Sequence, residues 1–442
     1  MPSATTTRVR WFLVFWLFVL SAVSYLDRVN ISIAGGSIVD AYHLTDVQLG
    51  KVFSALVAGY ALFQTLGGYL ADRFGPRRIL TLGVVWWGIF TALTALVPAN
   101  INNALLLFVL VRFSLGAGEA VIYPAANQFI ARWIPVRERG IANGWIFAGV
   151  GAGAGLSPPL ITYLMTHYGW RSSFWVCAII GFAAGAVWFV AARDNPSEHP
   201  RVSRGELEEI QSGLTVTNNP TAIPDAPPAR VLWKRVVRSR EVWAVTVSYF
   251  CYGYVAWIFF SWFFRYLVKV RGLDLKASSL YSMLPLLAML VCCLVGGTVN
   301  DRLTKWRGPR LGRCGVAAVG MAVAGIVIAF GSQVQGVRLA SVVLAGGAGA
   351  LYFAQSSFWS VTADIAGGSA GSVSGFMNMG GQIGGALTGS LTPWIAVQYG
   401  WTASFLVAAG LAVLGAICWL AVDPQRTLLP VPSVEALDQV HT

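Results

Sequence analysis

Apolar stretches long enough to cross a lipid bilayer dominate the chain, and short polar segments rich in Arg, Gly and Pro separate them. An α-helix needs about 20 apolar residues to span the hydrocarbon core. The first stretch follows Arg8 and Arg10 as in a signal peptide, but it shows no small-residue cleavage site and continues past Asp27. The pattern therefore predicts twelve spans, with approximate ends at 11–36, 47–70, 79–98, 103–130, 139–165, 173–192, 241–267, 280–299, 312–332, 337–361, 371–397 and 402–422.

A long polar interruption divides these spans six and six, and the two halves repeat one another. "GGYLADRFGPRR" (67–78) recurs as "GGTVNDRLTKWRGPR" (296–310), and "YGWRSSF" (168–174) recurs at nearly the same offset as "YGWTASF" (399–405). Two matches at one spacing indicate an internal duplication. We expect a six-helix bundle in 1–192, a cytoplasmic linker with a short surface helix in 193–240, a second bundle in 241–423 and a cytoplasmic tail in 424–442.

Composition and charge place the protein in a membrane. The 442 residues are 56% hydrophobic and only 11% charged, whereas soluble domains carry about 25% charged residues. With the N-terminus inside, the cytoplasmic segments hold about 22 of the 31 Lys and Arg residues, as the positive-inside rule requires. The net charge of +12 therefore orients the chain, with both termini cytoplasmic, and does not indicate nucleic-acid binding. The six cysteines lack metal-ligand spacing, so we expect no metal and no cofactor.

The repeated loop D-R-x-G-x-R-R follows the second span, and a second copy follows the eighth. An Asp at such a position can accept hydrogen bonds from a helix N-terminus, while Gly75 and Pro76 favour a tight turn. The repetition favours a function over a generic basic loop. We predict a cytoplasmic gate between helices formed by Asp72, Arg73, Asp301 and Arg302.

Ionisable residues deep in a span are costly and usually mark a transport pathway or a proton relay. Here they are Asp27, Arg28, Arg112 and Glu119. Adjacent helical residues project about 100° apart, so one of the first two can face a cavity and the other a neighbouring helix. The other two lie about 10 Å apart on one face and are not expected to pair with each other. Each could meet the first helix, with Asp27 as the natural partner; a purely structural ion-pair network is the alternative.

The signs of these charges suggest a chemistry. A guanidinium cannot lose its proton and suits a carboxylate ligand, whereas a buried carboxyl can bind and release a proton. The C-terminal half adds polar aromatic side chains, although a single aromatic residue is more often packing. As candidates for ligand contact we select Arg28 together with Tyr60, Gln64, Tyr123, Asn127, Trp257 and Asn378, and for proton coupling Asp27, Glu119 and Arg112.

The spans, the duplicated loop and the central linker resemble the major facilitator superfamily. "SYLDRVNIS" (24–32) and "VRFSLGAGEAVIYPAANQFIARWIPVRERG" (111–140) resemble its anion:cation symporter branch, which includes bacterial permeases for galactonate, glucarate and hexuronates, vesicular glutamate transporters and sialin. The resemblance implies an all-α fold of two six-helix bundles. It also implies that Arg28 binds the substrate anion and that Asp27 and Glu119 take part in proton coupling.

These observations predict a secondary transporter of the bacterial inner membrane, a proton-coupled symporter for a small organic anion. A sugar acid such as galactonate, glucarate or a hexuronate is favoured, with tartrate or a phthalate-like aromatic acid as alternatives. A drug/proton antiporter is disfavoured because its cavity would carry lone acids rather than arginines. An enzyme would need a nucleophile–base set or metal ligands near the membrane, and we find none. The expected partners are a small carboxylate, protons and lipid, and we expect a monomer.

Overall fold

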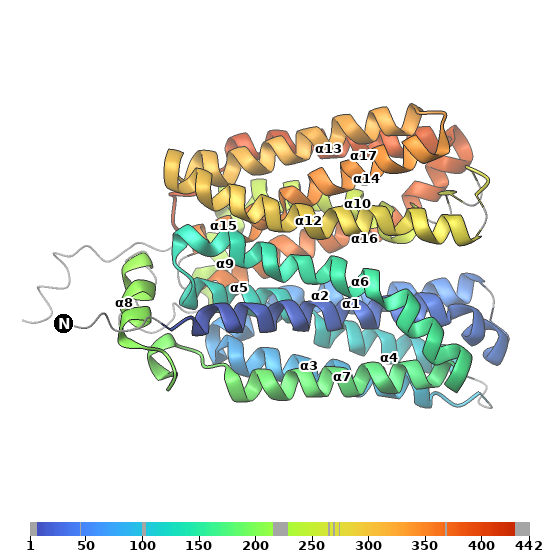
Figure 1. Cartoon of the computed structure of the whole chain (residues 1–442), viewed down its shortest axis with the longest axis horizontal. Helices are drawn as coiled ribbons and strands as arrows, with labels where there is room; N and C mark the ends of the chain where they lie inside the picture. The colour runs from blue at the N-terminus through green and yellow to red at the C-terminus, as the bar shows by residue number, and fades with distance from the viewer. Residues whose placement is uncertain are drawn as a thin grey trace, which may run out of the picture.

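Figure 1 shows a computed structural model in which long helices run side by side in two groups. It describes residues 7–44, 46–99, 103–214, 229–263, 266–267, 270–273, 275–366 and 369–428, and within them every regular element is a helix. The N-terminal group comprises α1 (Val9–Tyr42), α2 (Asp46–Phe74), α3 (Pro76–Leu96), α4 (Ala104–Glu119), α5 (Ile122–Trp133), α6 (Arg139–Tyr168) and α7 (Trp170–Ala191). The C-terminal group comprises α10 (Arg240–Ser261), α12 (Leu275–Arg307), the π-helix η5 (Arg310–Gly315), α13 (Val316–Gln333), α14 (Val337–Phe353), α15 (Gln355–Ala366), α16 (Ala370–Tyr399) and α17 (Trp401–Cys418).

Within each group, helices that are not neighbours in the sequence pack against one another. In the N-terminal bundle α1 packs on α6 and α7, α2 on α4, and α3 on α7; in the C-terminal bundle α10 packs on α16 and α17, and α13 on α14 and α17. The two bundles meet mainly where α6 contacts α12 and where α2 contacts α16. These two contacts are equivalent, because α2 corresponds to α12 and α6 to α16 in the two sequence repeats. The predicted two-bundle, all-α fold is confirmed.

Membrane crossing follows from the lengths of the helices. Ten segments of the described residues are long and apolar enough to span a bilayer. The glycine-rich helices α6 and α16, of 30 residues each, run beside them and complete twelve. The protein is therefore a multi-pass membrane protein.

Two predicted spans are each built from two helices. The fourth is broken between α4 and α5, where Pro124 stands in the first turn of α5 and cannot donate a backbone hydrogen bond to the preceding turn. The tenth is broken at Ala354, between α14 and α15. Residues close to both breaks, Tyr123 in the fourth span and Tyr352 and Gln355 in the tenth, line the cavity described below.

The linker contains two short helices, α8 (Arg204–Gly213) and α9 (Ala229–Arg238), while residues 215–228 and the tail beyond residue 428 lie outside the described residues. The surface helix α8 holds the start of α1. Glu206 accepts hydrogen bonds from the backbone N–H groups of Val9 and Arg10, at 3.1 and 3.0 Å. Glu209 receives both terminal nitrogens of the Arg10 guanidinium, at 3.0 and 2.8 Å. These contacts fasten the linker to the end of the N-terminal bundle at which α1 begins.

Candidate functional site

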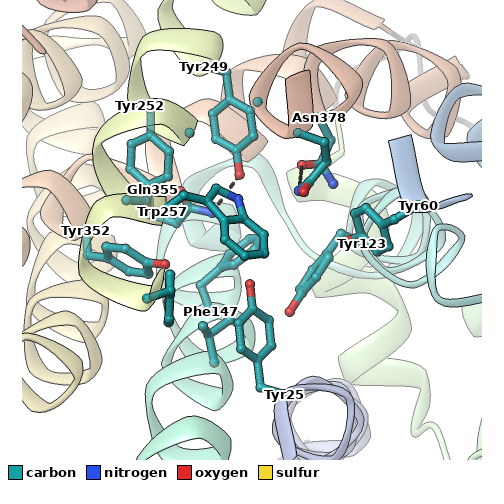
Figure 2. Close-up of a pocket in the computed structure, with 16 residues that line it drawn as sticks. Tyr25, Tyr60, Tyr123, Phe147, Tyr249, Tyr252, Trp257, Tyr352, Gln355 and Asn378 are labelled. Atoms are coloured by element: carbon teal, nitrogen blue, oxygen red, sulfur yellow. Dashed lines mark hydrogen bonds between the residues drawn. The ribbon is translucent and has the colours of Figure 1, made fainter. Parts of the chain in front are cut away.

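A small cavity of about 40 Å³ lies between the two bundles, with aromatic rings converging on it from both sides (Figure 2). Pockets for drug-sized ligands measure about 300–1,000 Å³, so this cavity is small by comparison. No lining side chain carries a full charge at neutral pH. The lining residues are Tyr25, Tyr60, Tyr123, Phe147, Val150, Tyr249, Tyr252, Gly253, Ala256, Trp257, Phe260, Tyr352, Gln355, Asn378, Gly381 and Gln382.

Four of the residues selected from the sequence line this cavity: Tyr60, Tyr123, Trp257 and Asn378. The other two uncharged candidates lie outside it. Gln64 is fully buried on α2, beside α16. The Nδ2 atom of Asn127 donates across the bundle interface to Thr362, at 3.2 Å. These two side chains therefore lie in the contact surface between the bundles, outside the cavity, which we call the seal.

Sequence reasoning missed several lining residues. Tyr25 lies two positions before Asp27 in a segment noted for its charges, and Tyr352 follows a run of small residues in α14. Altogether six tyrosines line the cavity, and each hydroxyl group can donate and accept a hydrogen bond. The polar aromatic side chains of the C-terminal half, noted in the sequence, were the signal that pointed to Tyr249 and Tyr252.

Arg28 lies directly behind two of these tyrosines. Its guanidinium carbon is 4.8 Å from the ring centre of Tyr25 and 4.3 Å from that of Tyr60. Its Nε donates to Oε2 of Glu119 at 2.8 Å, and the side chains of Arg28 and Glu119 are 8% and 0% exposed. Arg28 Nη2 and Glu119 Oε1 have no hydrogen-bond partner among the described residues. The guanidinium of Arg28 and the carboxylate of Glu119 could form two parallel hydrogen bonds, and they form one.

Asp27 faces a different neighbour, the interior of the N-terminal bundle. Thr91 on α3 donates to its Oδ2 at 3.3 Å, while its Oδ1 has no partner among the described residues. Arg112 is 2% exposed, and its charged neighbours are Glu119, Asp27 and Arg28. Among the described residues Asp27 forms no ion pair with Arg112 of the fourth span, and Glu119 of that span meets the first helix through Arg28 instead. The four groups form one buried cluster, which is neutral overall when all are ionised.

The C-terminal bundle contributes uncharged donors to the cavity. Tyr249 Oη accepts hydrogen bonds from Gln355 Nε2 at 3.0 Å and from Trp359 Nε1 at 3.3 Å. With both lone pairs used, its own hydrogen is available to a ligand, and Figure 2 shows the hydroxyl directed toward the middle of the cavity. Tyr252 stacks on this ring at 5.1 Å, and its hydroxyl has no partner among the described residues. A polar ligand group can therefore be bound here without a second cation.

The repeated Asp residues join the two bundles at one end of the molecule. Asp72, at the end of α2, accepts from the backbone N–H groups of Gly371 and Ser372 in the first turn of α16, at 2.9 and 2.7 Å. Asp301 accepts from those of Gly140 and Ile141 in the first turn of α6, at 2.8 and 2.6 Å. Each carboxylate thus caps a helix of the opposite bundle. We call these two equivalent contacts the cytoplasmic latch.

Glycine allows the latch to form. A Cβ atom on Gly68 would lie 2.0 Å from the carbonyl oxygen of Gly371, and one on Gly297 would lie 2.4 Å from that of Gly140. Neither space admits a side chain, so the helix backbones can approach closely only at glycine. The latch therefore depends on the small residues before each Asp as well as on the carboxylate itself.

The arginines that follow the two Asp residues do not take part in the latch. Arg73 is exposed and, among the described residues, donates to Tyr69 at 3.3 Å; Arg302 is also exposed. Buried arginines from other helices occupy the interface instead. Arg313 donates to Asp301 at 2.9 Å, and Arg139 donates to Asp364 on the opposite bundle at 2.6 Å.

The hydrogen bonds found between the bundles concentrate between the cavity and the end that carries α8. Besides the latch they include Asn143 to Ser360, at 3.4 Å, and Asn127 to Thr362. Tyr25 packs on Phe260 across the cavity, at 5.9 Å between ring centres, and α6 also meets α12 closely where Gly151 faces Leu286. Given the predicted orientation of the chain, the structure is sealed toward the cytoplasm.

Two bundles that meet around a central cavity, sealed at one end, define a membrane transporter of the alternating-access class. The family model of the Major Facilitator Superfamily matches residues 17–389, and the chain belongs to this superfamily. A transporter, rather than an enzyme, is thereby confirmed.

Several relatives are similar over most of the chain. The probable sulfoacetate transporter of Cupriavidus necator is 34% identical over 408 residues, covering 92% of each chain. The probable chloroplastic anion transporter 4 of Oryza sativa is 32% identical, covering 93% of this chain and 68% of that one. The probable galactarate/D-glucarate transporter of Bacillus subtilis is 31% identical, covering 69% and 67%.

Solved structures show the same fold at low sequence identity. A proton:xylose symporter bound to 6-bromo-6-deoxy-D-glucose superposes with a TM-score of 0.76 at 16% identity, covering 97% of this chain and 98% of that one. The transporter FucP in its outward conformation gives 0.70 at 18% identity, covering 93% and 99%. These likenesses support the architecture and carry no information on substrate.

Proposed function

We propose that the protein is a proton-coupled symporter that moves a small organic anion into the cell across the bacterial inner membrane. Family membership alone does not fix the cargo, because one fold serves many substrates. Relatives named for sulfoacetate, galactarate/D-glucarate and other anions support an anionic substrate. The observation that carries the proposal is the buried ion pair of Arg28 with Glu119, directly behind the cavity-lining rings of Tyr25 and Tyr60.

Competition for one guanidinium would couple the anion to a proton. When Glu119 binds a proton, it loses the charge that holds Arg28. The Nε atom and the unpartnered Nη2 then become available to a substrate carboxylate, which suits a planar bidentate donor. An unpaired buried guanidinium is costly, so the proton and the anion favour each other's binding. We expect neither the proton nor the anion to bind well without the other.

Asp27 and Arg112 would form the second part of the coupling cluster. Asp27 lies behind the cavity wall and contacts Thr91, so it acts on the substrate through charge rather than by contact. Arg112 is buried without an ion pair among the described residues, and it compensates whichever carboxylate is ionised. Protonation of Asp27 would leave the cluster more positive and strengthen anion binding at Arg28.

The remaining lining residues would bind the uncharged part of the substrate. Gln355 Oε1 and Asn378 Nδ2 are an acceptor and a donor without partners among the described residues. A polyhydroxy acid uses both functions because a hydroxyl group donates and accepts. We therefore favour a sugar acid such as galactonate, glucarate or a hexuronate, with Tyr60, Tyr123 and Trp257 packing around its chain.

Sulfoacetate is a second candidate substrate. The similarity to a relative named for it favours this compact anion. Its sulfonate would accept from hydroxyl donors such as Tyr249, but it would leave the acceptor Gln355 Oε1 unused. The number of hydroxyl groups on the ligand therefore separates the two candidates.

The latch would hold the cytoplasmic side closed in this state, and its release would open the cavity inward. We assign Asp72 and Asp301 to this gate and place Arg73 and Arg302 outside the bonded contacts. Gln64 and Asn127 would belong to the seal beneath the cavity. Both halves of the site come from one chain, which supports transport by a monomer.

A thermal-shift experiment tests the proposal. The purified protein is heated with galactonate, glucuronate, glucarate, sulfoacetate or the lipophilic cation tetraphenylphosphonium, at pH 6 and pH 8. A ligand that binds the folded state raises the melting temperature. We expect sugar acids to stabilise the protein, more strongly at pH 6, and Arg28→Gln to remove the effect. Stabilisation by the cation alone would instead indicate an antiporter, and stabilisation only by sulfoacetate would select the second candidate.

A further inference from the structure

The last residues that the structure describes return to the C-terminal bundle. Residues 423–428, which we call the strap, come after α17 and end beside α15. The backbone N–H of Leu428 donates to the carbonyl oxygen of Ile365 at 2.9 Å, and the carbonyl oxygen of Leu428 accepts from Nη1 of Arg235 on α9 at 3.0 Å. The side chain of Leu428 packs on the hydrophobic core. The end of the strap is therefore bound through its backbone and its side chain.

The strap also contacts α9 and α10, and both contacts start from anchored residues. On α9, Val236 is fully buried and Trp233 packs on the core, so Arg235 projects from a fixed helix. The ion pair of Arg426 with Glu241, at 3.1 Å, joins the strap to the first turn of α10. Exposed ion pairs contribute little stability, so we attribute the fixing of the strap mainly to the contacts of Leu428.

The part that the strap holds is the end of α15. Ile365 lies in the last turn of this helix, where backbone carbonyl groups lack partners within the helix. The N–H of Leu428 supplies one such partner and acts as a cap. Because α15 has only 12 residues and begins after the break at Ala354, its position depends on contacts with other elements.

The seal between the bundles depends on α15. Three of the hydrogen bonds across the bundle interface end on this helix, at Ser360, Thr362 and Asp364. Asp364, which accepts from Arg139 of the opposite bundle at 2.6 Å, is adjacent to Ile365 in the chain. The contacts of the strap described above all lie on α9, α10 and α15, so the strap can stay bound when the bundles separate.

We propose that the strap positions the end of α15 so that Asp364 meets Arg139, and that it thereby favours the state closed to the cytoplasm. The inference rests on the proposed gate and adds Leu428 and Arg235 to it as positioning residues that act through α15. Without the strap, the last turn of α15 would have to be ordered each time the seal forms. That entropic cost falls on the closed state, so the open state gains population.

Double electron–electron resonance between two spin labels in lipid nanodiscs tests the proposal. The labels are placed at Arg78→Cys on α3 and Lys305→Cys on α12, which are exposed positions on opposite bundles and lie outside α15 and the strap. Cys292 and Cys418, the two native cysteines that are not buried, are replaced by Ser. The measured quantity is the ratio of wide to narrow distances between the labels.

The test chain ends at Asp423 and lacks the rest of the strap, whereas the matched control ends at Pro430 and keeps it. One neutral hydrogen bond corresponds to roughly a fivefold change in an equilibrium. We therefore expect the ratio to rise roughly fivefold in the test chain and to stay within twofold of the parent in the control. Arg235→Gln should raise the ratio roughly two- to threefold, while Arg238→Gln, exposed on the same helix, should leave it unchanged. This second pair tests the proposal even where the shortened chain folds poorly.

Each chain is measured with and without Asp72→Ala, which opens the other half of the seal and raises the open population. The two effects should multiply, because the two sites share no partner. Wide distances in Asp72→Ala, but no added widening in the chain ending at Asp423 or in Arg235→Gln, would overturn the role of the strap and leave the gate in place. Unchanged distances in Asp72→Ala would overturn the gate and the strap together. Equal widening in the chains ending at Asp423 and at Pro430 would overturn the strap and assign the effect to residues beyond it.

Discussion

Replacing Asp72 by Ala should shift the transporter toward a state open to the cytoplasm. The carboxylate accepts two backbone N–H groups of α16 and the Ser372 hydroxyl, all from the opposite bundle. These bonds exist only while the cytoplasmic ends of the bundles touch. A contact made in one of two states biases the equilibrium by its full differential free energy.

The size of the shift can be worked from the contacts. Removing an acidic helix cap costs about 0.5–2 kcal/mol, and hydrogen bonds to charged groups contribute about 1.5–3 kcal/mol each. Asp72 is partly exposed, so we take about 2 kcal/mol for the whole contact. Since about 1.4 kcal/mol corresponds to a factor of ten, the cytoplasm-open population should rise roughly 30-fold.

A cysteine between the cavity and the latch reports that population. Ser360 is fully buried on α15, and Ser360→Cys is nearly isosteric. Its rate of alkylation by a hydrophilic maleimide should rise roughly 30-fold in the presence of Asp72→Ala. The matched control is Arg73→Ala, in the same loop but outside the latch, which should change the rate less than twofold. Equal rates in Asp72→Ala and the parent, with folding intact, would refute the gating role of the latch.

Three further outcomes are expected. Arg28→Lys should lose substrate affinity in a thermal-shift titration while staying folded, because an ammonium lacks the planar fork that grips a carboxylate; near-normal affinity would exclude Arg28 as the anchor. Tyr249→Phe should weaken galactonate up to about tenfold but leave a deoxy analogue unaffected, since one hydrogen bond is lost; equal losses would indicate a packing role. The hydrogen bond from Arg10 lowers the pKa of Glu209. The contribution of ionised Glu209 to the stability of the folded protein is therefore fully present above its unfolded pKa of about 4.3, and it is lost as pH falls through the lower pKa of the folded state. Glu209→Gln should therefore lower the melting temperature at pH 7 but not near pH 3, and an unchanged difference at both would contradict the assignment.

Two features of the sequence were the most informative: the repeated loop, and the rarity of charged residues within the predicted spans. The duplicated loop predicted two equivalent Asp contacts, and both cap helices of the opposite bundle. The rarity of charge in the spans identified the buried cluster, in which neither Arg28 nor Glu119 faces lipid. Both inferences rest on local physical rules that hold in any packing arrangement.

The differences between the selected residues and the cavity lining have one physical origin, the depth and rotation of helices after packing. Gln64 and Asn127 lie four residues beyond Tyr60 and Tyr123, so they share the correct helical face. Four residues also advance about 6 Å along the axis, which moves each from the cavity into the seal. Likewise, whether Asp27 or Arg28 meets α4 depends on the rotation of α1 about its axis, which adjacent positions in a sequence do not reveal.

The most direct test of coupling through Glu119 is a paired assay of Glu119→Gln and the parent in the same proteoliposomes. Gln mimics the protonated acid permanently, so Arg28 should remain able to bind the anion. Asp27→Asn, measured in parallel, should also lose proton-driven accumulation. The account predicts that Glu119→Gln exchanges substrate in counterflow but fails to concentrate it when only a pH difference is imposed. Accumulation equal to that of the parent would contradict it and make the ion pair of Arg28 and Glu119 structural.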